Sequence, residues 1–133
     1  MRDLLERVCG YLNGFEERLC DFLPETFGSS NPQASAALLP DIREKRYVDG
    51  SCRADIPFEI RLRIGGSSMR GKLDAVKFFG SLAEYMRENP MRGEADGGKI
   101  TGIRPNGGCT KSAVLKNGDE EYRMAFYVEV SIG

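Results

Sequence analysis

Residues 53–64 alternate strictly between polar and apolar side chains, and no other feature of the chain constrains the fold as much. The apolar positions are Ala54, Ile56, Phe58, Ile60, Leu62 and Ile64. Because successive side chains of a strand point to opposite faces, this pattern predicts a strand with one buried face. The preceding pair Asp49-Gly50 is common between antiparallel strands, since glycine adopts positive φ without a steric penalty. The segment therefore predicts a hairpin with strands at 38–48 and 52–64.

Side-chain parity restricts the turn of this hairpin. With a two-residue loop, Arg43 and Lys45 would share the apolar face of the second strand, and burying two cations is costly. An odd loop such as 49–51, or an equivalent bulge, avoids this burial and pairs Val48 with Cys52.

The same register places Ile42 opposite Phe58. Pro57 adds a further requirement, because proline has no N–H to donate to a ladder. We expect it at an edge or at a position where no hydrogen bond is made.

The N-terminal third of the chain predicts a helix followed by a loop. Leu4, Val8 and Phe15 recur at helical spacing with polar residues between them, which indicates an amphipathic helix. Residues 19–23, before a proline, fit either the end of this helix or a short strand. Residues 25–36 are rich in glycine, serine, asparagine and proline, which predicts a loop that is flexible.

The rest of the chain predicts one more helix and three more strands. A helix begins after residues 65–68 with a serine N-cap and ends at Asn89-Pro90. Weaker strands are expected near 99–103 and 110–115, followed by a turn at Asn117-Gly118 and a clearly alternating last strand. The order α-β-β-α-β-β-β predicts one α+β domain spanning 1–133, a mainly antiparallel sheet with two helices packed on one face.

Composition limits the classes of function. The chain has 133 residues, 19 basic and 20 acidic side chains and a net charge of −1, so no global field favours nucleic acid or an anionic membrane. No stretch approaches the roughly 20 apolar residues of a membrane helix, and the acidic N-terminus does not resemble a signal peptide, so a cytoplasmic origin is expected. The chain has four scattered cysteines and no histidine, which removes the commonest general base and metal ligand. We expect no catalytic residue, no metal and no cofactor, and no direct binding to nucleic acid or membrane.

The stretch from Gly66 to Lys72 satisfies the G-x-x-x-x-G-K pattern of a phosphate-binding loop. The next residue is Leu73, where such a loop needs a hydroxyl to hold magnesium, and the strand before it alternates in the antiparallel manner. The favoured interpretation is a glycine-rich connection with a serine cap, with a small nucleotide-binding module as the alternative.

Two charged clusters have structural interpretations. The carboxylates at 119–121 follow a glycine turn without the spacing of a calcium loop, which favours a solvated turn. Arg53, Arg61 and Arg63 share a strand face with Asp55 and Glu59, which is typical of a mixed-charge sheet surface, either solvated or paired with another subunit.

The second helix has an apolar arc wider than a surface helix needs. Phe78, Leu82 and Tyr85 lie within it. Either the sheet and the first helix cover the two sides of this arc, or a second subunit covers part of it.

The stretch ALLPDIREKRYVDGS, followed by FEIRLRI, resembles the small minor capsid or tail-terminator proteins of bacteriophages and prophages. The resemblance covers about Leu19 to Ile132. Its specific part is the turn Tyr47-Val48-Asp49-Gly50-Ser51 with Phe58 in the following strand. The second helix, the strand start Lys99-Ile100 and the final strand support it.

This resemblance implies a tail-terminator-like fold and a structural protein of the virion. Members are expected to form a hexameric ring that caps the tail tube, stops its growth and faces the head connector. The implied partners are copies of the chain itself, tail-tube proteins and connector proteins. The implied location is the host bacterial cytoplasm during assembly and then the virion. Tyr47, Asp49, Gly50, Ser51 and Phe58 are implied as fold or interface positions. An adaptor domain that binds one protein partner without forming a ring is the alternative.

Overall fold

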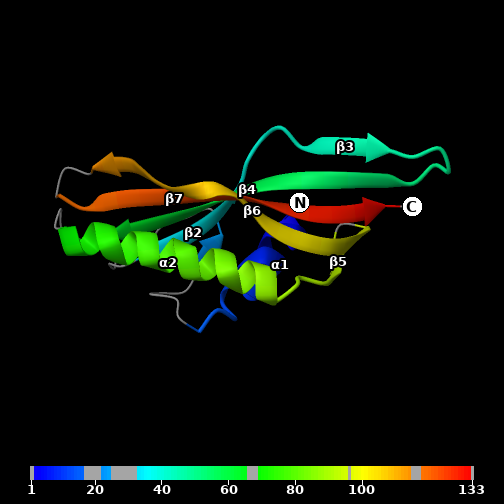
Figure 1. Ribbon diagram of the computed structural model, residues 1–133. Helices are drawn as coiled ribbons and strands as arrows, with labels where there is room; N and C mark the ends of the chain where they lie inside the picture. Colours follow the sequence, from blue (N-terminus) through cyan, green and yellow to red (C-terminus); the bar gives the residue numbers. More distant parts are fainter. Residues whose placement is uncertain are drawn as a thin grey trace.

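In the computed structural model, two helices pack against a curled sheet of seven strands (Figure 1). The structure describes residues 2–16, 22–24, 33–65, 69–95, 97–114 and 118–132. In chain order the elements are α1 (Arg2–Leu12), β1 (Phe22–Pro24), β2 (Gln33–Leu38), β3 (Arg43–Arg46), β4 (Cys52–Ile64), α2 (Met69–Glu88), β5 (Gly93–Ala95), β6 (Gly98–Val114) and β7 (Glu120–Ile132).

The long strands β4 and β7 form the centre of the sheet. They pair antiparallel over their whole length, from Cys52 opposite Ile132 to Ile64 opposite Glu120. The strand order is β1-β2-β4-β7-β6-β5, with β3 paired to the same edge of β4 as β2, and only β1 and β2 run parallel. The predicted α+β class with a mainly antiparallel sheet is confirmed.

The inward face of β4 and β7 forms the core. All six apolar residues of the alternating stretch in β4 are buried, as are Tyr122, Met124, Phe126, Val128 and Val130 of β7. Phe58 stacks on Phe126 across the two strands, with ring centroids 5.5 Å apart. The alternation along both strands therefore predicted the buried face correctly.

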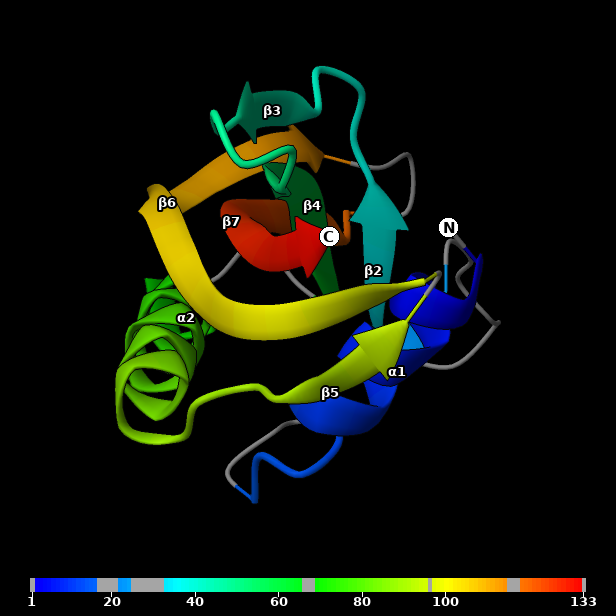
Figure 2. The same ribbon diagram turned by 90° about the vertical axis from the view of Figure 1, so that its right-hand side faces the viewer.

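Both helices lie on the same side of the sheet (Figures 1 and 2). α1 buries Leu4, Val8 and Leu12 toward the sheet, as its helical spacing predicts. α2 ends where expected: the Asn89 backbone N–H donates to the Tyr85 carbonyl at 2.8 Å, and Pro90 follows. The predicted serine cap, within 66–68, lies outside the described residues.

The strand predicted at 38–48 is wrong in its extent. It is divided into β2 and β3, and β2 begins at Gln33, inside the loop predicted for 25–36; residues 25–32 lie outside the described part of the chain. The division lies opposite Pro57. The Leu39 N–H donates to the Pro57 carbonyl at 2.9 Å, but Pro57 has no N–H with which to return a bond, so the β2 ladder stops there. Asp41, at φ 73°, then redirects the chain into β3.

The strands predicted at 99–103 and 110–115 are one strand, β6. Its register with β7 shifts between Asn106 and Thr110, where Gly107 has φ 88°, so the glycines make a bulge and not an end. Of the two interpretations of residues 19–23, the structure shows a strand, β1, at Phe22–Pro24, while 19–21 lie outside the described residues. The short strand β5 was not predicted from the sequence. The predicted β6–β7 hairpin is confirmed, with Gly118 at φ 90°.

Candidate interaction surfaces

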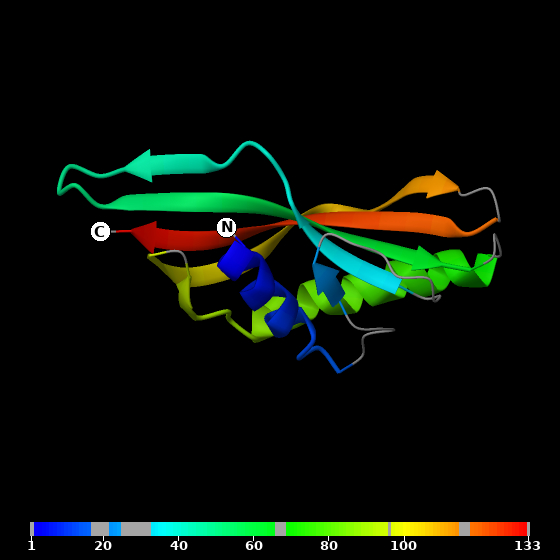
Figure 3. The same ribbon diagram turned by 180° about the vertical axis from the view of Figure 1, so that it is seen from behind.

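β3, the turn at residues 47–51 and Cys52–Asp55 of β4 form an arm that extends past the helices at one end of the molecule (Figures 1 and 3). Every residue from 40 to 50 is exposed. Ile42, Tyr47 and Val48 are large apolar residues among them, and Val48 at the tip is fully exposed. An exposed apolar tip on a projecting hairpin is typical of a contact site.

The tip of the arm is held by short local hydrogen bonds. The Tyr47 N–H donates to the Ser51 carbonyl at 2.9 Å, and the Gly50 N–H donates to the Tyr47 carbonyl at 3.0 Å. Gly50 has φ 89°, which a glycine adopts without strain. Ser51 donates from its N–H and its hydroxyl to Asp49 Oδ1, at 3.0 and 2.6 Å. These bonds lower the pKa of the Asp49 carboxyl, so the tip is preformed and negatively charged at its end.

The predicted odd loop is present, but its register is wrong. Arg46, not Val48, lies opposite Cys52, and the loop is Val48-Asp49-Gly50, closed by the bonds between Tyr47 and Ser51. Gly50 takes the positive φ at the last position of the loop. Val48 is the first residue of the loop and lies beyond the last paired residues of the ladder.

The predicted partner of Phe58 was also wrong, since Leu38 and not Ile42 lies opposite it. The parity argument itself is confirmed: Arg43 lies opposite Asp55 and Lys45 opposite Arg53, so both cations share the polar face.

The candidate interface residues of α2 lie mostly in the core. Phe78 and Leu82 are buried, like Phe58 in β4, so none of the three offers an exposed contact. Tyr85 is half-buried; its hydroxyl donates to the Tyr11 carbonyl at 3.3 Å and its ring lies 5.2 Å from the Tyr11 ring. The sheet and the segment around the end of α1 therefore cover these positions of the wide apolar arc.

The exposed apolar residues of α2 are Leu73 and Val76, at 61% and 52% exposure. Periodicity placed both within the arc but did not indicate which part of it stays uncovered, because that depends on where the sheet lies. Leu73 and Val76 form a second apolar contact site, separate from the arm.

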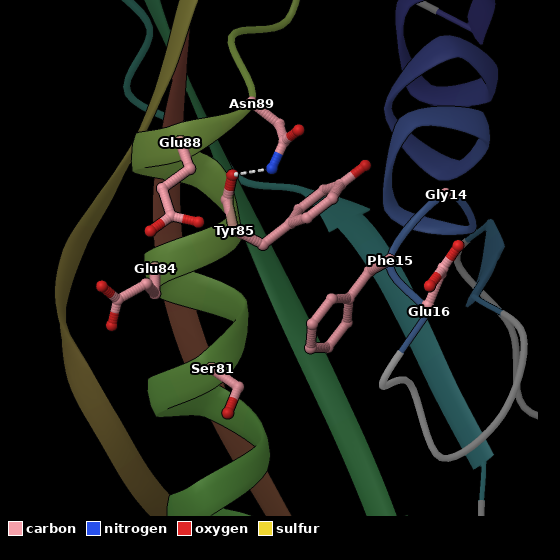
Figure 4. Close-up of a pocket in the computed structure, with 8 residues that line it drawn as sticks. All are labelled: Gly14, Phe15, Glu16, Ser81, Glu84, Tyr85, Glu88 and Asn89. Atoms are coloured by element: carbon pink, nitrogen blue, oxygen red, sulfur yellow. Dashed lines mark hydrogen bonds between the residues drawn. The ribbon is translucent and has the colours of Figure 1, made fainter.

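A groove of about 570 Å³ lies between the end of α2 and the segment that follows α1 (Figure 4). Its lining residues are Gly14, Phe15, Glu16, Ser81, Glu84, Tyr85, Glu88 and Asn89. The rings of Phe15 and Tyr85 lie between the two walls, with centroids 5.3 Å apart. A Cβ at Gly14 would lie 3.0 Å from the Tyr85 hydroxyl, so a larger residue there would require the Tyr85 side chain to shift. Among the described residues that line the groove, three are carboxylates and none is a cation, so this part of its lining is negative.

The outer face of the sheet carries paired charges, as the mixed-charge interpretation predicts. Arg104 lies 3.1 Å from Asp55, and Arg61 Nε lies 2.6 Å from a Glu59 carboxylate oxygen. Arg104 also lies over the Tyr127 ring at 5.0 Å. Arg53, Arg61, Arg104 and Arg123 thus each lie within 4 Å of a carboxylate of the same chain.

The solvated turn predicted for residues 119–121 is wrong for Glu120, which is 4% exposed. It accepts a hydrogen bond from the Tyr122 hydroxyl and lies 3.4 Å from Lys111 Nζ. Burial, and then the hydrogen bond and charge of Glu120, raise the pKa of Tyr122 to about 12. Within the described residues no group of histidine, cysteine or acidic side chains is placed to hold a metal ion.

The described cysteines, Cys9, Cys52 and Cys109, are free. Burial and the charge of Glu6 raise the pKa of Cys9 to about 11, and burial raises that of Cys109 to about 11. Thiols with such pKa values are weak nucleophiles at neutral pH. The predicted glycine-lysine connection cannot be compared, since 66–68 and the Lys72 side chain lie outside what the structure describes. Among the described helices, none has the length and apolar character needed to span a bilayer.

No protein-family model and no curated protein matches the sequence. Among solved structures, the chain is similar to a chain of the structure described as the virion of a native gene transfer agent particle. The TM-score is 0.51 at 12% sequence identity, over 83% of this chain and 77% of the other. At this identity the similarity shows a shared fold.

Proposed function

We propose that this chain is a structural protein of a phage-like virion. The observation that carries the proposal is the fold shared with a chain of a gene transfer agent virion. The resemblance of the segment around Tyr47–Ser51 to phage minor capsid and tail-terminator proteins supports the more specific role. In this role the chain forms a hexameric ring that caps the tail tube and joins it to the head connector.

The two exposed apolar sites suit such a ring. A ring of identical subunits is built from heterologous contacts, so each subunit must present two different complementary patches. The arm offers Tyr47 and Val48 at one end of the molecule, and α2 offers Leu73 and Val76 on a different element. A head-to-tail arrangement uses both patches on every subunit.

The role requires no chemistry of the chain's own. We infer that it is not an enzyme and that it uses no cofactor. Its partners are copies of itself, tail-tube proteins and head-connector proteins. It works in the bacterial cytoplasm during assembly and then in the virion.

Light scattering across a concentration series, with and without isolated tail tubes, tests the proposal. We expect association at high concentration or on the tube, since ring closure can need the tube as a template. Electron microscopy of the tubes should show a cap at one end. A protein that stays monomeric and never caps a tube would contradict the ring and favour a monomeric adaptor.

A charge on the α2 patch gives a sharper version of the same test. Leu73→Asp should reduce association without unfolding the protein, because an exposed residue has little packing to lose. Val114→Asp is the matched control, since Val114 is 58% exposed at the end of β6 and lies outside both patches.

A further inference from the structure

Gly80 lies in the middle of the 20-residue helix α2, on its exposed side. A Cβ there would meet nothing within 4 Å, so no contact within the described residues requires a glycine. A glycine inside a helix is about 1 kcal/mol less favourable than alanine. The exposed face of α2 therefore carries a gap, a helical position without a side chain. The gap destabilises the monomer and leaves room for the close approach of another molecule.

The surroundings of Gly80 differ from those of the other exposed helical glycine. Projected around α2, Gly80 lies between Val76 and Glu84 on one stripe, next to Leu73. Gly10 of α1 also has open space at its Cβ, but the exposed residues before it on α1 are charged or polar, Asp3, Glu6 and Arg7 among them. Of these two glycines, only Gly80 combines the gap with an exposed apolar neighbour.

The same face of α2 becomes acidic toward its C-terminal end. Glu84 and Glu88 line the groove that Glu16 completes from the other wall. Lys77 and Arg87 are also exposed on α2 but do not line this groove. The surface thus runs from an apolar patch, over the gap at Gly80, to a negative groove.

The arm carries the complementary sequence of side chains. Lys45 and Arg46 are exposed cations, and Tyr47 and Val48 follow as exposed apolar residues. Lys45 and Tyr47 share one face of the hairpin and lie about 7 Å apart along the chain, while from Val76 to Glu84 a helix rises about 12 Å, a difference that the length of a lysine side chain can cover. A charge beside an apolar residue on the arm can therefore reach both kinds of surface on α2.

We propose that the arm of one copy lies across α2 of a neighbouring copy, with Tyr47 and Val48 on Leu73 and Val76, the arm passing over Gly80, and Lys45 at the acidic groove. The contact is between copies, because the arm points away from α2 within one chain (Figures 1 and 3). It rests on the proposed self-assembly and assigns the two complementary patches of that assembly. Gly80 allows the arm to approach α2 closely, and burial of the apolar side chains stabilises the contact. The charges determine the direction in which the arm lies along the helix.

A glycine pair tests the close approach. Gly80→Gln should leave the monomer at least as stable in urea unfolding, since the helix gains a better helix former. It should weaken association by about tenfold or more in light scattering, because the side chain fills the gap. Gly10→Gln is the matched control and should change only stability. Association of Gly80→Gln equal to that of the unchanged protein would overturn the contact.

A charge exchange tests the direction. Lys45→Glu and Glu84→Lys should each weaken association, and the double variant should recover most of it. Glu94→Lys, an exposed residue of β5 away from both elements, should have no effect. Single variants without effect, or a double variant no better than the singles, would contradict the pairing.

A disulfide trap separates this inference from the proposed function. With Cys20, Cys52 and Cys109 replaced by serine, Val48→Cys mixed with Val76→Cys should form an intermolecular crosslink under mild oxidation, while neither variant alone should do so at a comparable rate. Capping of tubes by the unchanged protein without this crosslink would overturn the contact alone. Crosslinking without capping would overturn the tail role and leave the contact standing. Neither capping nor crosslinking would overturn both.

Discussion

The two halves of β4 continue one alternating pattern and both pair with β7, but they are covered to different extents on the other edge. From Phe58 to Ile64 the strand lies between β2 and β7, and even Glu59 on its polar face is buried. From Cys52 to Asp55 it forms the arm with β3, whose four residues are all exposed. The alternation determines which face of the strand is apolar. The elements that cover this face determine how much the stability of the fold depends on its side chains. Side chains of the body maintain the fold, and those of the arm are available for contacts.

The largest effect is expected in the body. Phe58→Ala removes a buried ring stacked on Phe126 and should lower the free energy of unfolding by about 3–5 kcal/mol. Urea unfolding followed by circular dichroism measures it. Ile42→Ala in the arm should cost much less, and equal losses at the two positions would contradict the contrast between body and arm.

Tyr122→Phe, also in the body, should cost about 1–3 kcal/mol at neutral pH, because buried Glu120 loses a hydrogen-bond donor. The pKa of Tyr122 is raised from 10.0 to about 12, so its neutral form is favoured by the fold. This contribution to stability is full below about pH 10 and is lost as the pH rises through about 12.

The test is to measure the urea midpoints of the unchanged protein and of Tyr122→Phe between pH 8 and 12. The difference between the unchanged protein and Tyr122→Phe should narrow with rising pH, because only the unchanged protein loses the contribution of the Tyr122 hydroxyl. A difference that stays constant would show that the tyrosine does not titrate as described.

Gly50→Ala should cost about 1–2 kcal/mol at the tip of the arm, because alanine is strained at φ 89°. Gly108→Ala in β6 is the matched control, since its Cβ would meet nothing within 4 Å and its φ is not in the left-handed region. Hydrogen exchange of the arm amides would locate the loss. Faster exchange throughout the body would contradict the local character of the arm.

Val48→Asp should have the smallest effect on stability, within about 0.5 kcal/mol, because Val48 is fully exposed. Its effect should appear in association, which the charge weakens. A stable variant that associates normally would exclude the arm tip from the contact.

The sequence predicted the body better than the arm for a physical reason. A strand with one buried face has apolar residues at every second position, so the inward residues of β4 and β7 could be identified without the structure. The division between β2 and β3 produces no such repeating pattern in the sequence. It depends on the missing N–H of Pro57 and on the positive φ of Asp41, a conformation that few non-glycine residues adopt and that the sequence does not mark.

The contact sites were harder to predict than the core. The arm residues Tyr47, Asp49, Gly50 and Ser51 were identified from the resemblance to phage proteins, and all but the half-buried Ser51 are exposed. On α2 the apolar arc was recognised, but Phe78 and Leu82 in it are buried and Leu73 and Val76 are not. A helical projection shows how wide an arc is, and only the position of the sheet shows which part remains open.

The pairing of β4 with β7 also has a consequence for how the chain folds. Its nearest partners, Ile64 and Glu120, are far apart in the sequence, whereas β6 and β7 are joined by a short turn. Closing a long loop costs conformational entropy before any stabilising contact between the strands has formed. We therefore expect refolding on the millisecond to second scale. The β6–β7 hairpin should form early and β4 should dock onto it in the rate-limiting step. During that interval the free edge of β7 is exposed, and newly made chains at high concentration are then most prone to aggregate.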